Sequence, residues 1–422
     1  MEPLDAFRQR AAAWIADNLP MMASGGSPGN PMASDEDPPF ARQRSLQRQL
    51  WDGGFAGLAF PVKYGGGGLT PDHQRVFVEE AQGREYPVRF TMPTIGIIGA
   101  TLFEFGSEEQ KRRYLPEMLR GDALWVQFLS EPTCGSDLAG ARTRATRDGE
   151  GWVLNGSKVW SSAAYGCQYG LCLARTNWDV PKHRGLTMFV VPTDSPRLQM
   201  RRIKQVDGSM EFCEEFFDDV VLPGNAVVGD VEHGWTVASR LLGNERDSVG
   251  GSSPWIGPVV IERGAGYRAR SLVEEAVAAG RASDPRVRTL VATAHVLSAV
   301  NQQLVRRVAE RVAAGMAQGP EGAILKLARA VSEASLATIA LELAGTDAVV
   351  ASRPDNEPTS VGMGVGYLMR QARSLAGGSN EMQRNLIAER LLGMPRELAP
   401  DAGAPFSQVR ARALDPTARI RS

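Results

Sequence analysis

Long hydrophobic runs are missing from this 422-residue sequence. No stretch reaches the roughly 18 uninterrupted apolar residues that a membrane span needs. The N-terminal segment carries Glu2 and Asp5 and no long apolar block, unlike a secretory signal or an acid-poor transit peptide. Neither sign of charge is in excess, since 47 Lys and Arg oppose 48 Asp and Glu. We therefore expect a cytoplasmic protein with neither nucleic acid nor a membrane surface as its partner.

Cysteine and histidine are scarce, with four of each in the chain. The cysteines form neither metal-type pairs nor a secreted disulfide framework, which predicts free thiols in a reducing compartment. No histidine has a second histidine or a cysteine at ligand spacing, so we expect no metal site. The cysteines are Cys134, Cys167, Cys172 and Cys213, and the histidines are His73, His183, His233 and His295.

Common nucleotide and hydrolase motifs are also missing from the contexts they require. In GEGWVLNGSK, Gly149 to Lys158, the lysine follows the serine, whereas a Walker loop needs Gly-Lys-Ser/Thr at the start of a helix. GMGVG, Gly362 to Gly366, lacks the dinucleotide spacing. A G-x-S-x-G match at Gly25 to Gly29 lies in a Pro/Gly-rich loop and not at a strand-turn-helix elbow. Neither a P-loop enzyme nor an α/β-hydrolase is expected.

Three zones of different periodicity are present. Apolar residues recur three and four positions apart from Leu4 to about Leu119, which predicts helices. Short alternating segments from about Ala123 to Gly229 predict a small antiparallel barrel or sandwich, with Asn155-Gly156 as a hairpin turn. Long apolar-faced helices from Gly234 to Leu392 predict a bundle that packs on other subunits.

This order predicts an α+β multidomain protein, because one core rarely exceeds about 250 to 300 residues. We place an N-terminal α-helical domain at 1–122, a middle antiparallel β-barrel at 123–230, a C-terminal helical bundle at 231–396 and a loose tail at 397–422.

The segment FLSEPTCGSDLAG, Phe128 to Gly140, could bind a ligand. It starts as a strand, turns at Pro132, and then presents hydroxyls and backbone N–H groups that could hold a polar ring edge or a phosphate. The alternative is a plain loop in which Asp137 caps a turn. VWSS, Val159 to Ser162, adds an aromatic plane and two more hydroxyls nearby in sequence, which favours the binding interpretation.

Glu245 is a carboxylate within an apolar helical stripe. Desolvation on such a face would raise its pKa toward the range useful for a general base. The alternative is an ion pair with Arg246 or Arg240 at the rim, and spacing alone leaves both interpretations open. The stripe consists of Trp235, Ala238, Leu241, Leu242, Glu245 and Val249.

Several segments together resemble the acyl-CoA dehydrogenase family, from about residue 4 to about residue 396. The segments are FLSEPTCGSD, NGSKVWSS, EFCEEFFDDVVLP, the GW...ER helix and GGSNEMQRNLIAERLLGMPR. The resemblance implies a C-terminal four-helix bundle and FAD bound between barrel and bundle. It also implies oxidation of an acyl-CoA thioester to the trans-2-enoyl product, as in fatty acid or sterol side-chain β-oxidation. A carboxylate removes the α-proton and the β-hydrogen leaves as hydride to the flavin.

The resemblance also assigns site residues. Phe128, Leu129 and Ser130 would edge the isoalloxazine ring. Trp160 would pack on the flavin, with Ser161 and Ser162 toward its reactive edge. Ser136 would lie beside the CoA arm and the flavin phosphates. Ser379 and Glu381 match FAD contacts, although medium-chain members carry Thr and Gln there. Arg246 matches a residue of the thioester pocket.

The main departure from the family pattern is Gly377, where most short- and medium-chain members place the catalytic glutamate. Isovaleryl- and long-chain-type members place the base at the position of Glu245, so the resemblance and the stripe select the same residue. The space freed beside Gly377 predicts an α-branched, ring-bearing or sterol-derived acyl group. Gly377 and Gly378 should end one helix, and Asn380 with Gln383 should cap the next.

The resemblance leaves other assignments open. An electron-transferring flavoprotein is the family's usual electron acceptor, and a tetramer is its usual assembly. The chain could instead be the catalytic subunit of a heterotetrameric dehydrogenase. It could also act on acyl-carrier-protein thioesters, or be a flavin monooxygenase of the same fold, although those enzymes lack a carboxylate base.

Overall fold

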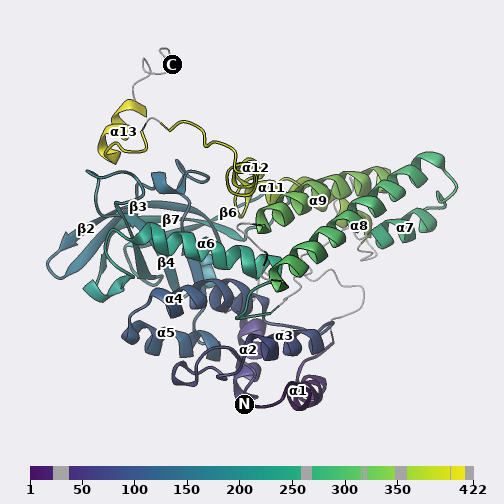
Figure 1. The fold of residues 1–422 in the computed structure, drawn as a ribbon, viewed down its shortest axis with the longest axis horizontal. Coiled ribbons are helices and arrows are strands. Elements are labelled where there is room, and N and C mark those ends of the chain that lie inside the picture. Colours follow the sequence, from purple (N-terminus) through teal and green to yellow (C-terminus); the bar gives the residue numbers. More distant parts are fainter. Residues whose placement is uncertain are drawn as a thin grey trace.

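The computed structural model describes residues 1–21, 38–257, 269–314, 316, 321–346, 359–399 and 401–413. The N-terminal helices lie beneath a central sheet, and long C-terminal helices extend to one side (Figure 1). The expected order of helices, sheet and helices is confirmed. Within these ranges, no helix is both long and apolar enough to cross a membrane.

The N-terminal region is helical because its apolar residues recur at helical spacing and capping residues lie at the helix ends. Helix α5 starts at a capping box of Ser107 and Gln110 and stops at Gly121, whose φ is 85°. The η2 segment is π-helical, contains Pro93, and is buried along its whole length. The elements are α1 Leu4–Asn18, α2 Ala41–Asp52, η1 Val62–Tyr64, α3 Pro71–Glu80, η2 Phe90–Gly99, α4 Ala100–Phe105 and α5 Glu108–Arg120.

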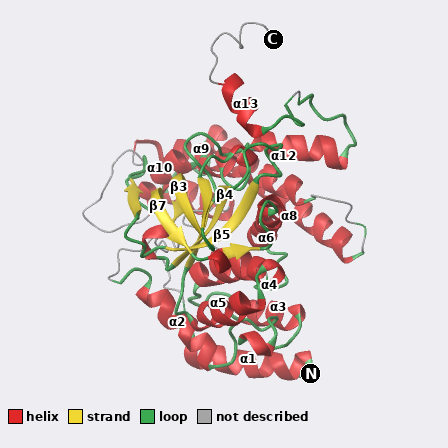
Figure 2. Ribbon diagram, turned by 90° about the vertical axis from the view of Figure 1, so that its left-hand side faces the viewer, coloured by secondary structure: helices red, strands yellow, loops and turns green. Residues whose placement is uncertain are grey.

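The middle region forms one eight-stranded sheet in the order β6-β7-β3-β2-β4-β5-β8, with β1 added to β4. Most neighbours are antiparallel, as expected, but β1 and β2 both pair with β4 in parallel. Figure 2 shows the sheet between the two sets of helices. The strands are β1 Trp125–Phe128, β2 Arg144–Asp148, β3 Gly151–Ser162, β4 Tyr169–Arg175, β5 Leu186–Pro192, β6 Leu198–Ile203, β7 Phe212–Leu222 and β8 Val227–Val228.

The hairpin predicted at Asn155-Gly156 is wrong. β3 runs through both residues, and the register against β7 shifts between Leu154 and Gly156. Asn155 Nδ2 donates to Asp219 Oδ1 at 2.9 Å, and Gly156 has a φ of 143°. A bulge needs the same residue types as a tight turn, which explains the error.

The C-terminal helices belong to two cores. Helix α6 packs with the sheet and the N-terminal helices, whereas α7 to α10 build a smaller separate cluster. Helix α9 contacts α6, α8, α10, α11 and α12. The helices are α6 Gly234–Gly250, α7 Ala269–Ala278, α8 Pro285–Ala313, α9 Gly322–Ala344, α10 Thr359–Met369, α11 Ala372–Leu375, α12 Asn380–Leu386, the π-helical η7 Ile387–Leu391 and α13 Phe406–Ala413.

The tail, for which we expect no fixed structure, is docked where it is described. Phe406 of α13 is buried, its backbone N–H donates to the Val180 carbonyl at 2.9 Å, and the Arg175 guanidinium lies 3.8 Å from its ring centroid. One apolar residue in a polar tail therefore anchors the segment. Residues 414–422 lie outside the described ranges.

Glu215 of β7 is a fully buried carboxyl group. Ser161 Oγ donates to its Oε2 at 2.9 Å, and its Oε1 has no hydrogen-bond partner among the described residues. Burial raises the pKa of Glu215 to about 8, although the Ser161 hydrogen bond and the Lys158 charge oppose the shift.

Replacing Glu215 with Gln should stabilise the protein at alkaline pH. Because the folded-state pKa lies above the ordinary value, Glu215 lowers the free energy of unfolding progressively as pH rises from about 4.5 to about 8. Glu215→Gln removes this penalty, which can reach a few kcal/mol at about 1.4 kcal/mol per pKa unit. Thermal melting from pH 4 to 9 measures the effect.

The melting temperature of Glu215→Gln should match wild type at pH 4 and exceed it above pH 8. Glu214→Gln, one position along the same strand at a partly exposed side chain, is the control and should show no such trend. A difference independent of pH would contradict the assignment.

Candidate functional site

Glu245 of α6 and Gly377 of the α11–α12 loop face each other. A Cβ atom built at Gly377 would lie 3.6 Å from Glu245 Oε1, with no other heavy atom within 4 Å. The φ of Gly377 is 66°, a conformation that favours glycine. Two residues that the sequence analysis selected separately, one as a base and one as a vacated base position, thus border one space.

Glu245 lies at the flank of the buried stripe of α6. The buried positions are Val237, Ala238, Leu241, Asn244 and Ser248, whereas Glu245 is partly buried and Val249 is exposed. The stripe is therefore shifted from the predicted one, because η2 and α4 as well as β4 and β5 cover the helix. The shift leaves the Glu245 carboxylate at the edge of the core and partly exposed.

Gln127 of β1 contacts Glu245 from the sheet side, and the sequence analysis missed it. Its Nε2 donates to Glu245 Oε2 at 3.5 Å. The neighbouring Phe128 ring is fully buried against Phe217 inside the sheet, so strand alternation directs Gln127 the opposite way. That alternation was a signal that could have identified Gln127.

The loop that follows β1 is held by a buried ion pair. Lys158 Nζ is 2.9 Å from Glu131 Oε1, and both side chains are almost completely buried. Glu131 also accepts from the backbone N–H groups of Arg142 and Thr143 at 2.7 and 2.8 Å. Burial opposes ionisation of Glu131, but the Lys158 charge and these N–H donors hold its pKa below the ordinary value.

The predicted flavin-contact residues of this loop differ in what they can offer. Phe128 is fully buried and Leu129 nearly so, so their contribution to a ligand outside the sheet is mainly backbone. The Ser130 carbonyl accepts from Val159 N–H at 2.9 Å, which ties the loop to β3. Ser136 is exposed, and the adjacent Asp137 pairs with Lys182 at 2.7 Å.

Trp160 projects from a bulge in β3. Its φ is 68°, the register against β7 shifts between Val159 and Ser161, and 57% of the Trp160 side chain is exposed. Ser161 instead points inward to Glu215. An exposed indole in a strained backbone conformation is the feature that a planar ligand could cover.

Arg89 supports the same bulge and was also missed by the sequence analysis. This arginine precedes η2 and is 1% exposed. Its Nη2 donates to the Ser162 carbonyl at 2.6 Å and to Cys167 Sγ at 3.3 Å. A single arginine beside an apolar run carries little signal, because its partners lie far away in sequence.

Ser379 and Glu381 lie at the start of α12. The Ser379 side chain accepts from Met382 N–H, so Ser379 is the N-cap and the predicted cap at Asn380 is wrong. Backbone and Ser379 hydrogen bonds lower the pKa of the exposed Glu381 carboxyl. Gln383 Nε2 donates to the carbonyl of Gly378 at 3.2 Å, which fixes the glycine loop to the helix.

These surroundings fit the flavin that the resemblance implies. Three buried polar atoms beside the Glu245–Gly377 space have no hydrogen-bond partner among the described residues: Gln127 Oε1, Asn380 Oδ1 and Gln383 Oε1. Gly377 adds a backbone without a side chain, whereas the Cβ position of Gly378 is filled by Gln383 Nε2. The exposed Trp160 indole of β3 offers a plane on which a ring could stack. No group of three His, Cys, Asp or Glu side chains in the described ranges could hold a metal ion.

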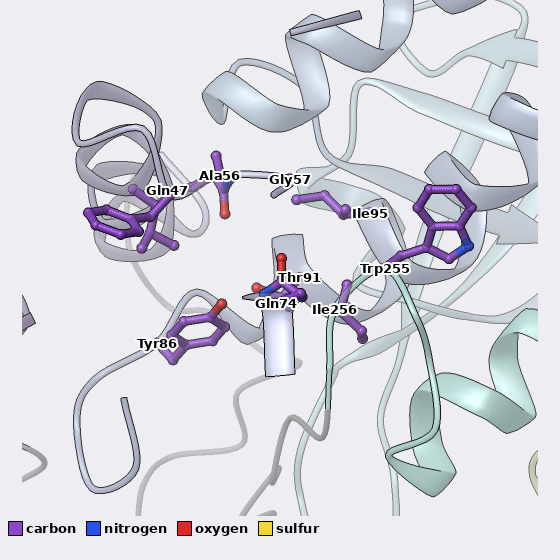
Figure 3. A pocket seen from close by; sticks show the side chains of 11 residues that line it. Gln47, Ala56, Gly57, Gln74, Tyr86, Thr91, Ile95, Trp255 and Ile256 are labelled. Carbon is purple, nitrogen blue, oxygen red and sulfur yellow. The ribbon is translucent and has the colours of Figure 1, made fainter. Parts of the chain in front are cut away.

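A separate cavity in the N-terminal region is not this site. It lies among Gln74, Thr91, Ile95 and Trp255 and has a volume of about 10 Å³ (Figure 3). That volume holds at most about one water molecule, so it cannot admit a cofactor.

Known proteins match the chain along nearly its whole length. Family models of acyl-CoA dehydrogenases match residues 5–122 as the N-terminal domain, 127–220 as the middle domain and 232–392 as the C-terminal domain. Acyl-CoA dehydrogenase IpdE1 of Mycobacterium tuberculosis is 35% identical over 403 residues, which cover 94% of this chain and 99% of the relative.

Solved structures agree with this assignment. The Tcur3481-Tcur3483 steroid ACAD has a TM-score of 0.75 at 26% identity, covering 94% of this chain and 99% of that chain. The ChsE4-ChsE5 complex from Mycobacterium tuberculosis has a TM-score of 0.70 at 23% identity over the same shares, which supports the fold alone. This chain belongs to the acyl-CoA dehydrogenase family of FAD-dependent oxidoreductases, which act on CH–CH bonds.

Proposed function

We propose that the chain oxidises an acyl-CoA thioester to its trans-2-enoyl product, with Glu245 as the base that removes the α-proton. The supporting observation is the position of the Glu245 carboxylate, whose Oε1 lies 3.6 Å from the place that a Cβ atom would take at Gly377. When bound, FAD supplies the acceptor for the β-hydride. Glu245 receives the proton in a partly water-excluded position, where its charge is stabilised less by solvent than at the surface.

Residues from the sheet and the bundle would hold the cofactor and the thioester. Phe128, Leu129 and Ser130 would offer backbone groups to the flavin ring, and Trp160 its indole plane. Ser162 would border the reactive edge together with the backbone of Ser161, whose hydroxyl is turned inward to Glu215 and does not face the ligand as the resemblance implied. Ser379 and Glu381 would contact FAD from the start of α12. Ser136 and Arg246 would line the path of the CoA arm and thioester.

The alternative role for Glu245 is a surface ion pair with Arg240 or Arg246, and Arg240 has another partner. Arg240 Nε donates to Glu104 Oε2 of α4 at 2.7 Å, so this guanidinium is already paired. The carboxylate base also distinguishes the dehydrogenase from the flavin monooxygenase branch, for which no described feature argues. A carrier-protein thioester remains the alternative to CoA, with the same chemistry at Glu245.

Glu245→Gln should keep FAD but lose oxidation. The amide has the shape of the carboxylate and cannot accept the α-proton, so flavin bleaching by an acyl-CoA should slow by at least about 10³-fold. Stopped-flow absorbance of the FAD-loaded variant measures this. Asp247→Asn on the same helix is the control and should bleach normally, and undiminished bleaching of Glu245→Gln would sink the assignment.

The substrate class follows from the missing side chain at Gly377. Glycine there leaves room beside the carboxylate, which suits an α-branched, ring-bearing or sterol-derived acyl group over a straight medium chain. The similarity to the Tcur3481-Tcur3483 structure, a steroid ACAD, supports the same class.

Gly377→Ala should discriminate against bulky acyl groups. Its methyl would approach Glu245 Oε1 to 3.6 Å and fill the space. Bleaching rates with a ring-bearing acyl-CoA should fall about tenfold or more relative to a straight short-chain acyl-CoA. Gly393→Ala is the matched control, because Gly393 has nearly the same φ, 65° against 66°, and no heavy atom within 4 Å of its Cβ position. Equal losses for both substrates would contradict the proposal.

The chain would act in an oligomer, as a homotetramer or as one subunit of a heterotetramer. Apolar side chains are exposed along the bundle, where a partner could cover them. They include Val296, Val300 and Val305 on α8, Val331 on α9, and Val365 and Leu368 on α10. The Tcur3481-Tcur3483 steroid ACAD, which pairs two different chains, supports a heteromer, and expression with and without a partner chain distinguishes the two.

The electron acceptor and the cellular compartment complete the proposed function. An electron-transferring flavoprotein would reoxidise the flavin. The four cysteines are free and buried, which supports the reducing cytoplasm as the compartment.

A further inference from the structure

Gln127 and Glu245 meet in a way that distinguishes the two carboxylate oxygens. Gln127 Nε2 lies 3.5 Å from Oε2, whereas Oε1 faces the position of a Cβ at Gly377 at 3.6 Å. One oxygen therefore contacts an amide from the sheet, and the other points to the space proposed for the acyl group. The two contacts come from different elements, β1 and the α11–α12 loop.

We propose that Gln127 is a positioning residue for Glu245, which anchors Oε2 and directs Oε1 at the substrate α-carbon. The inference rests on the proposed function of Glu245. The proposal gives Glu245 a partner residue in the reaction and identifies Oε1 as the oxygen that takes the substrate α-proton.

The backbone of Gln127 is held in place by strand pairing. Gln127 pairs in register with Leu171 of β4, and the flanking Val126 and Phe128 are buried. A glutamate on a helix has three rotatable side-chain bonds, so a donor on a neighbouring strand restricts it to fewer rotamers. If the Gln127 amide were flipped, its oxygen would face the Glu245 carboxylate. Two acceptor oxygens repel each other, so the flipped orientation is disfavoured.

An amide donor also favours the charged carboxylate. A hydrogen bond to an ionised group stabilises the anion relative to the acid, so Glu245 should stay ionised to lower pH when Gln127 is present. Gln127 cannot itself take the proton. The Gln127 amide thus keeps Glu245 ionised and does not compete with it for the substrate proton.

Other charged residues lie on the helix of Glu245 and on the described elements that pack on it, and they remain unchanged when Gln127 is replaced. On its own helix these are Arg240, Arg246 and Asp247. The segments η2 and β5 that pack on α6 carry no charged side chain. On the other packed elements, the charged groups are Glu104 of α4, Arg175 of β4, and Lys326, Arg329, Glu333 and Glu342 of α9.

The test measures Glu245 directly in FAD-loaded enzyme without substrate. A water-soluble carbodiimide with glycine ethyl ester labels protonated carboxyl groups, and peptide mass spectrometry reports labelling at Glu245 across pH. In Gln127→Leu the pH midpoint of labelling should rise by about one unit, the shift expected for loss of one hydrogen bond to a charged group. Gln199→Leu, at an exposed position of β6, is the matched control.

Bleaching kinetics give the second readout. In Gln127→Leu the acid limb of the bleaching rate should move up by the same amount. At a pH below the midpoint, kcat should fall about tenfold while KM changes little, because the substrate's own contacts are intact.

Gln127→Glu is a second variant that still tests the proposal if Gln127→Leu folds poorly. It is isosteric, and a second carboxylate beside Glu245 should raise the labelling midpoint further through like-charge repulsion. Unmoved midpoints in both variants would overturn the proposal. A shifted midpoint without bleaching by any acyl-CoA would support the Gln127 contact and sink the proposed function instead.

Discussion

The buried ion pair between Lys158 and Glu131 fixes the backbone on which the site is built. Lys158 Nζ donates to the carbonyls of Leu129 and Leu173 as well as to Glu131, and so joins β1, β3 and β4 at one point. A lone charge at this depth would be unstable, so each partner requires the other. The loop after β1 and the Trp160 bulge of β3 both leave the sheet beside this pair, which explains why their relative position is set.

Strain and polarity are concentrated around that anchor. Trp160 takes a positive φ, Glu215 is buried behind it, and Arg89 reaches the Ser162 carbonyl from the N-terminal helices. Each feature is unfavourable alone. Ser161 Oγ offsets part of the cost of burying Glu215, and the Ser162 and Cys167 acceptors satisfy part of the Arg89 guanidinium. The polar interior of the sheet thus supports the exposed Trp160 bulge, which belongs to the proposed flavin site.

The sequence predicted the order of domains, because helical and strand periodicity change clearly near residues 122 and 231. It also selected Glu245 and Gly377, one through an apolar stripe and both through family resemblance. The bulge at Asn155 and Gly156 was taken for a turn, because the two structures use the same residues. Gln127 and Arg89 were missed because their roles arise only from long-range contacts, and the docking of α13 depends on the single residue Phe406.

The two hydrophobic cores divide the proposed site between two bodies. Glu245 lies on α6, whose apolar residues belong to the large core, whereas the Gly377 loop is carried by α11 and α12, which pack on α9. Glu245 and the Gly377 loop are therefore held by different cores, which meet at the contact between α6 and α9. If the proposed acyl pocket lies between them, its width depends on how the helical bundle packs against α6, and a partner subunit bound to the bundle would alter substrate selectivity without contacting the substrate.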